Sequence, residues 1–186
     1  KAKAASGNGG KVRKPSRLLE RFAESMPAGG IALDYGFGIG TDMAWMRRQG
    51  FRVEGIDGVG EFVRQAQQCC PDSPVIHGRF ESIRLPQGRY DGIWCNAALI
   101  HVPPEVLPPQ LEKLRSALKA SGILGMTLAW GSRQGFTRRD WIPGRYLAGY
   151  TRQEVARFFR GWNVKELKVV SRDGRKGRWI QVLAVP

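Results

Sequence analysis

The sequence predicts an α/β fold: a mostly parallel sheet with helices on both faces, a three-layer sandwich. Short apolar runs alternate with segments of helical periodicity along most of the chain, which is typical of such a sheet. Two long strand-like runs then close the chain around a turn-forming Asp173-Gly174 pair, which predicts an antiparallel hairpin. The length of 186 residues fits one domain. We therefore expect seven strands, the last of them antiparallel to its neighbours.

The elements follow in order from local signals. A first helix is expected after Ser16, an N-cap residue, because apolar residues recur at helical spacing until Gly29-Gly30. Another helix is expected near Thr151, where Glu154 completes a capping box. The remaining helices are predicted at residues 42–49, 61–69 and 104–120, and the strands at 31–35, 51–57, 74–78, 90–97, 123–129, 163–171 and 179–185.

Basic residues gather at both ends of the chain. The formal charge is +14 overall, with +6 over residues 1–17 and +9 from residue 133 onward, so the middle is nearly neutral. This excess either attracts an anionic partner, such as a nucleic acid, an anionic small molecule or a membrane surface, or is solvated surface. Residues 1–15 have no apolar periodicity and are expected to form a flexible basic lead-in to a single domain over residues 16–186.

Several classes of protein are excluded by composition. No apolar stretch approaches the roughly 18 residues that a membrane-spanning helix needs. The three cysteines, two of them adjacent, make neither a disulfide framework nor a metal site of usual spacing. We therefore expect a cytoplasmic protein that has no membrane partner and binds no metal.

The most informative segment runs from Asp34 to Asp42 and reads DYGFGIGTD. It leaves a predicted strand, enters a predicted helix and carries glycines at i, i+2 and i+4. A dinucleotide fingerprint needs its third glycine where Thr41 stands, and a nucleotide phosphate loop needs a Lys that is missing here. The flanking acids suit a cationic ligand, and Asp57 ends the second strand, where an acid binds a ribose. The pattern therefore favours a positively charged cofactor that carries a ribose.

With these residues, the sequence resembles the class I S-adenosylmethionine-dependent methyltransferases from about residue 18 to residue 185. The glycine loop, Asp57, the segment YDGIWCNAALIH at residues 90–101 and residues 114–128 match four motifs of that family in the right order. The terminal hairpin matches the family's reversed seventh strand. The resemblance implies a Rossmann-like fold, S-adenosylmethionine as cofactor and S-adenosylhomocysteine as product.

The resemblance also assigns roles to single residues. Asp57 either binds the cofactor's ribose or caps the next helix. Asp34 either contacts the ligand or holds the amides of the loop. Asn96 either lines the sulfonium end of the pocket or caps its strand. Arg79 stands where relatives often carry an acid that reads adenine, which leaves that task to Phe80 or Glu81. The expected cofactor-binding residues are Asp34, Gly36, Phe37, Gly38, Gly40, Asp57, Gly58, Phe80, Glu81 and Asn96.

Methyl transfer from a sulfonium is an in-line displacement, so the enzyme mainly aligns donor and acceptor. If the acceptor is a hydroxyl or a protonated amine, a general base helps, and His101 is the candidate; otherwise His101 supports the cofactor pocket. The segment 130–150 interleaves Arg with aromatics and is either the acceptor's wall or an ordinary loop. Its candidate substrate-binding residues are Trp130, Arg138, Arg139, Trp141, Arg145 and Tyr146.

Two classes of acceptor remain open. A small molecule, anionic or aromatic, fits a chain with few residues to spare for additional binding modules. RNA is the alternative, with the basic flanks contacting phosphates. The oligomeric state does not follow from the sequence.

Overall fold

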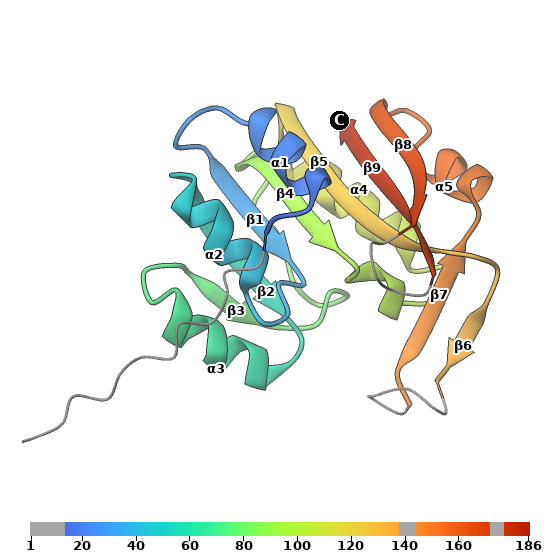
Figure 1. Ribbon diagram of the computed structural model, residues 1–186, viewed down its shortest axis with the longest axis horizontal. Coiled ribbons are helices and arrows are strands. Elements are labelled where there is room, and N and C mark those ends of the chain that lie inside the picture. The colour runs from blue at the N-terminus through green and yellow to red at the C-terminus, as the bar shows by residue number, and fades with distance from the viewer. Residues whose placement is uncertain (1–13, 138–143, 172–176) are drawn as a thin grey trace, which may run out of the picture.

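The computed structural model describes residues 14–137, 144–171 and 177–186 (Figure 1). The expected basic lead-in lies outside the described residues except for its last two. The helices are α1 (Arg17–Glu24), α2 (Thr41–Arg48), α3 (Gly60–Cys69), η1 (Leu99–His101), α4 (Leu107–Ala117) and α5 (Arg152–Phe158). The strands are β1 (Ile31–Tyr35), β2 (Arg52–Asp57), β3 (Val75–His77), β4 (Tyr90–Asn96), β5 (Leu118–Trp130), β6 (Gln134–Phe136), β7 (Tyr146–Tyr150), β8 (Asn163–Ser171) and β9 (Arg178–Val185).

The sheet has the mostly parallel order that the alternation predicts. Strands β3, β2, β1, β4 and β5 lie side by side and parallel. Strand β9 then pairs antiparallel with β5, and β8 pairs antiparallel with β9. Because the chain runs outward from β1 through β2 to β3 and then returns to β4, the strand order switches between β1 and β4. A ligand site is expected outside the carboxyl ends of the strands at such a point.

Helices cover both faces of the sheet (Figure 1). On one face, Phe22 of α1 and Met43 of α2 belong to a buried cluster that also holds Trp94 of β4. On the other face, Leu114 of α4 and Val155 of α5 belong to a second cluster. The predicted three-layer sandwich is therefore confirmed.

Two glycines bring α1 close to the centre of the sheet. A Cβ atom on Gly92 would lie 2.6 Å from Phe22 Cζ, and one on Gly125 would lie 2.6 Å from Trp94 Cε3, both too short for real contacts. The Ser16 side chain caps α1 by accepting from the Leu19 amide at 3.2 Å. The start of α1 is thereby fixed over the carboxyl ends of β4 and β5.

All seven predicted strands are present, but the expected number of strands is wrong. The segment 130–150, expected as a loop, also contains β6 and β7, which pair antiparallel with each other. Strand β7 also pairs in parallel with the end of β5. These strands are only 3 and 5 residues long, too short for a period-two pattern to stand out. The described sheet therefore has nine strands.

The observed boundaries differ most from the predicted ones around α4, whereas those of the last two strands agree to within one residue. Helix α4 is shorter than predicted, because Leu118 already pairs with Tyr90 and begins β5, with a register shift before Gly92. The capping box of Thr151 and Glu154 is present as predicted. The hairpin of β8 and β9 is confirmed, while its Asp173-Gly174 turn lies outside the described residues. In the described part of the chain, no helix is long and apolar enough to cross a membrane.

Candidate functional site

The predicted glycine loop lies between the end of β1 and the start of α2. Gly36, Gly38 and Gly40 have φ angles of +83°, +56° and +75°, which side chains disfavour. A Cβ on Gly36 would lie 2.3 Å from Ala98 Cβ, so this glycine packs against the loop after β4. A Cβ on Gly38 would meet nothing within 4 Å, so the backbone there faces open space. The loop thus exposes bare backbone at the carboxyl end of the sheet.

Asp57 ties this loop to the end of β2. Its Oδ2 accepts a hydrogen bond from the Gly38 amide at 2.8 Å, and its Oδ1 accepts one from the Val59 amide at 2.8 Å. Burial raises the pKa of the carboxyl group, and the hydrogen bonds from Val59 and Gly38 partly offset this rise. The carboxylate therefore positions the loop and caps the following turn, so both expected roles of Asp57 remain compatible with its place.

The side chains of Ile39 and Val59 flank Asp57 and expose apolar surface. They are 54% and 47% accessible to solvent, which is high for large aliphatic side chains. Because Asp57 binds the amides of Gly38 and Val59, both aliphatic residues lie close to its carboxylate. A flat apolar ring next to a hydroxylated group would fit this combination.

Asp34 at the end of β1 is 1% exposed. Burial raises the pKa of this carboxyl group well above its ordinary value, and the nearby carboxylates of Asp42 and Asp57 raise it further. The Met43 amide donates to it, so Asp34 holds the start of α2 rather than an amide of the glycine loop itself. Its Oδ2 has no hydrogen-bond partner among the residues the structure describes.

A chain of hydrogen bonds joins α2 to the ends of β4 and β5. Asp42 Oδ2 accepts from Trp94 Nε1 and from Asn96 Nδ2, each at 2.9 Å. The Thr127 hydroxyl donates to Asn96 Oδ1 at 2.7 Å and accepts from the Ala97 amide at 2.9 Å. Ala97 itself has a φ of +56°, a strained value that this bonding sustains at the end of β4. Asn96 is therefore a fixed part of the site rather than a simple strand cap.

A cleft of about 1180 Å³ opens beside this chain of bonds. Its walls come from the start of α1, the start of α2, the ends of β4 and β5, and the end of the β8–β9 hairpin that lies beside them. The lining residues are Lys14, Pro15, Ser16, Arg17, Glu20, Arg21, Asp42, Asn96, Thr127, Lys168, Val170, Ser171, Trp179 and Gln181.

The remaining cofactor candidates lie around the loop in different settings. The Phe37 side chain is 6% exposed and belongs to the core, where it fills the space above Gly55, so its ring faces away from the open side of the loop. The Gly58 carbonyl lies 3.1 Å from His77 Nε2. The Phe80 carbonyl accepts from Lys113 Nζ at 2.5 Å, and the neighbouring Glu81 lies 3.6 Å from Arg79.

His101 lies in η1, close to β7. Its Nδ1 is 3.0 Å from the Tyr146 carbonyl oxygen, and because a carbonyl only accepts, Nδ1 carries the proton. His101 is not among the residues that line the cleft, whereas Asp42 is.

The candidate acceptor wall of residues 130–150 is only partly described. Arg138, Arg139 and Trp141 lie outside the described residues. Trp130 is 40% exposed, and the Arg178 guanidinium stacks over its ring at 3.4 Å. The structure brings Tyr146 against Phe136, with ring centroids 5.4 Å apart, and Arg145 directly precedes it. None of the described candidates in this segment lines the cleft.

The cleft instead contains residues that sequence reasoning did not select. Lys168 and Trp179 come from the β8–β9 hairpin, some seventy residues and more beyond Asn96 in sequence. Lys14 and Arg17 were noted only as part of the basic amino-terminal segment. Their charge was the one available signal, and nothing local in the sequence placed them at the site.

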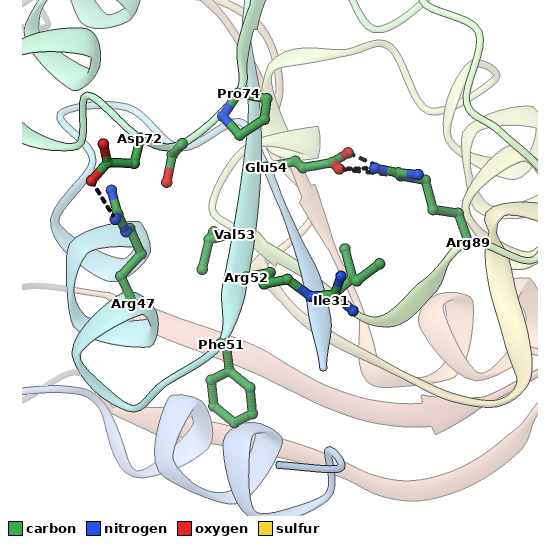
Figure 2. Close-up of a pocket in the computed structure, with 10 residues that line it drawn as sticks. Ile31, Arg47, Phe51, Arg52, Val53, Glu54, Asp72, Pro74 and Arg89 are labelled. Carbon is green, nitrogen blue, oxygen red and sulfur yellow. Dashed lines mark hydrogen bonds and ion pairs between the residues drawn. The ribbon is translucent and has the colours of Figure 1, made fainter. Parts of the chain in front are cut away.

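A smaller cavity of about 290 Å³ lies toward the opposite, amino-terminal edge of the strands (Figure 2). Four of its five charged side chains form two ion pairs: Arg47 with Asp72 at 3.1 Å, and Arg89 with Glu54. The hydroxyl of Tyr90 also donates to Glu54 at 2.9 Å. The fifth, Arg52, donates to the Gly29 carbonyl at 3.3 Å and forms no ion pair among the described residues.

Comparisons with known proteins agree with this geometry. Residues 32–122 match the family model of a methyltransferase domain. This range contains the glycine loop, Asp57 and Asn96. No curated protein matches the chain.

Solved structures share the fold at low sequence identity. A 1,6-didemethyltoxoflavin-N1-methyltransferase from Burkholderia thailandensis, with S-adenosylhomocysteine bound, superposes with a TM-score of 0.72 at 19% identity, covering 91% of this chain and 78% of that one. A methyltransferase from Methanosarcina mazei gives 0.79 at 15% identity, covering 93% and 98%. The magnesium protoporphyrin IX methyltransferase from Synechocystis gives 0.69 at 19% identity, covering 90% and 76%.

Proposed function

We propose that this chain, whose residues 32–122 match the family model of a methyltransferase domain, is a class I S-adenosylmethionine-dependent methyltransferase that transfers the methyl group to a small-molecule acceptor bound in the cleft beside Asp42 and Asn96. The observation that carries the proposal is the cleft itself. Asp42, which follows the loop glycines in the chain, lines it, and elements on several sides bound it. Its volume of about 1180 Å³ is slightly above the upper end, roughly 1,000 Å³, of the range for small-molecule sites, so it has room for part of a cofactor and a compact acceptor.

The residues around the glycine loop fit the cofactor. The open backbone at Gly38 lets a ligand approach closely, and Asp57 next to it supplies a carboxylate for ribose hydroxyls. The exposed side chains of Ile39 and Val59 suit the faces of an adenine ring. Asp34, Asp42 and Asp57 form no ion pair among the described residues, which favours a cationic sulfonium over a phosphate. When bound, S-adenosylmethionine supplies the electrophilic methyl group.

The chain's own contribution to the reaction is mainly positioning, which is worth about 7–11 kcal/mol in well-aligned reactions. Trp94 and Asn96 donate to the Asp42 carboxylate, and the Thr127 hydroxyl holds Asn96 in turn, on the wall of the cleft where an acceptor's reacting group would lie. His101 does not line the cleft, so we propose it as the base only for an acceptor whose reacting group extends beyond that lining. Its protonated Nδ1 leaves Nε2 as the basic nitrogen of the neutral ring.

Two of the similar structures support a small acceptor, since their names specify 1,6-didemethyltoxoflavin and magnesium protoporphyrin IX. RNA remains the alternative because of the basic flanks, but most of the amino-terminal flank lies outside the described residues. We also propose a cytoplasmic location, supported by three cysteines that are all unpaired.

The acceptor class is tested by following the methyl group. The purified protein is incubated with S-adenosylmethionine tritiated on the methyl group and with a cell extract separated into an ultrafiltrate and an RNA fraction. We expect label in a product of the ultrafiltrate, and none with the Gly38→Val variant as control. Label confined to ribonuclease-sensitive material would contradict the small-molecule assignment.

A further inference from the structure

Basic side chains from two segments that are distant in sequence line the cleft. Lys14 and Arg17 lie at the start of α1, and Lys168 lies on β8. We propose that these three side chains form a subsite for a carboxylate or phosphate group of the methyl acceptor. This inference rests on the proposed function, because it assumes that the acceptor binds in this cleft.

Only some of the charged side chains that line the cleft have a partner. Among the described residues, neither Lys14 nor Arg17 has an ion pair or a hydrogen bond through its side chain, although both line the cleft. Arg21 is held at 2.7 Å by Glu166, and Lys168 lies 3.1 Å from the other oxygen of the same carboxylate. One carboxylate thus serves two cations. The wall keeps an excess of positive charge that an anionic group would balance.

Two acids also line the cleft. Asp42, at the start of α2, is bound by the neutral donors of Trp94 and Asn96. Glu20 is exposed on α1, three residues after Arg17, and forms no ion pair within the described part of the chain. The four lining cations, Lys14, Arg17, Arg21 and Lys168, still outnumber these two acids and the Glu166 carboxylate, and an anionic acceptor would turn its charged group toward Lys14, Arg17 and Lys168 and its other end toward Asp42.

Trp179 adds a large aromatic side chain to the same lining. Together with Val170 it gives the cleft apolar surface beside its charged residues. The preferred acceptor is thus a compact molecule with an aromatic or apolar body and one anionic group.

The test uses the full chain saturated with S-adenosylhomocysteine, so that no turnover occurs. Benzoate and inorganic phosphate are the probes, titrated by calorimetry into the wild type and a Lys14→Ala, Arg17→Ala double variant. We expect one site for benzoate and a loss of about tenfold or more in its affinity in the double variant, as for a lost charged contact. A charge-matched control, Arg160→Ala with Lys165→Ala, changes two exposed cations outside the cleft and should keep the wild-type affinity.

Two results would overturn the subsite. One is benzoate binding that is absent, or equally strong in both double variants. The other is a double variant that loses affinity for S-adenosylhomocysteine itself, because the cations would then hold the carboxylate of the cofactor. Thermal unfolding checks that both variants fold. The titration reports only on the subsite, whereas the tritium experiment reports the class of acceptor, so the failure of one is distinguishable from the failure of the other.

Discussion

Buried and half-buried carboxylates have different partners at the two ends of the parallel sheet. Toward the amino end, Glu54 pairs with Arg89 and Asp91 pairs with Lys119 at 2.7 Å. Toward the carboxyl end, Asp34 and Asp57 are held by backbone amides and form no ion pair among the described residues. The same residue types therefore serve stability at one end and leave negative charge available at the other.

The pKa values follow this division. At the amino end, burial opposes ionisation of Glu54 and Asp91, but hydrogen bonds, including those from Arg89 and Lys119, outweigh it and lower both pKa values. At the carboxyl end, burial dominates and raises the pKa values of Asp34 and Asp57. A cationic ligand would supply there the partner that the protein omits. The comparison identifies the carboxyl end as the binding end without reference to any motif.

The largest effect is expected from Gly38→Val. A side chain at this position would occupy the open space beside the loop and would adopt an unfavourable positive φ. We expect loss of cofactor binding by about a hundredfold or more in calorimetry, while the circular dichroism spectrum stays that of the wild type. Wild-type affinity would mean that the ligand does not approach this backbone.

Asp57→Ala tests the carboxyl end of the sheet at the carboxylate that accepts hydrogen bonds from the Gly38 and Val59 amides. The change removes hydrogen bonds that hold the loop and those proposed for the ribose, each worth about 1.5–3 kcal/mol when charged. Cofactor affinity should fall by roughly 10- to 100-fold. Asp72→Ala, which breaks an exposed ion pair with Arg47 at the amino end, is the control and should bind like the wild type.

Asp42→Asn is a finer test, because it removes a charge while keeping an acceptor for Trp94 and Asn96. S-adenosylmethionine carries a sulfonium charge that S-adenosylhomocysteine lacks. The preference for the methylated form should fall by about three- to tenfold. Glu20→Gln removes the other acid of the cleft, farther from the loop in the chain, and should leave this preference unchanged. If the ratio of the affinities for S-adenosylmethionine and S-adenosylhomocysteine stayed the same in Asp42→Asn, the Asp42 charge would not contribute to binding the sulfonium.

The smallest effect is expected at the amino end. Asp91→Asn weakens the contact with Lys119 and should lower the free energy of unfolding by about 1 kcal/mol, with cofactor affinity unchanged. Because folding lowers the pKa of Asp91, its contribution is full above the ordinary Asp value near 4 and is lost as the pH falls through the lower folded value. The difference between variant and wild type in urea unfolding should therefore vanish on acidification. A reduced cofactor affinity in this variant would break the division between the two ends.

Local patterns in the sequence predicted the parts of the molecule that depend on local chemistry. The glycine loop, the end of β2 at Asp57 and the caps at Ser16 and Thr151 are each specified within a few neighbouring residues. The strands β6 and β7 escaped prediction because they are short and are stabilised by pairing with each other and with β5.

The candidate site could likewise be predicted only where its residues belong to a local sequence pattern. Phe37 was expected at the cofactor, but its ring turns into the core because Gly55 on the adjacent strand leaves room for it. The cleft depends on Lys14 and Arg17 meeting Lys168 and Trp179 from the other end of the chain. Such a meeting follows from the place of β9 beside β5, which no local pattern specifies.

The central claim is that unpaired carboxylates at the carboxyl end of the sheet bind a cationic adenosyl sulfonium. Calorimetric titration of the wild type with S-adenosylmethionine, from neutral pH down toward pH 4, tests it most directly. We expect saturable binding at one site that weakens on acidification, because the raised pKa values make these carboxyl groups take up protons and lose their charge at a higher pH than ordinary Asp side chains do. No binding, or an affinity that does not change with pH, would contradict it.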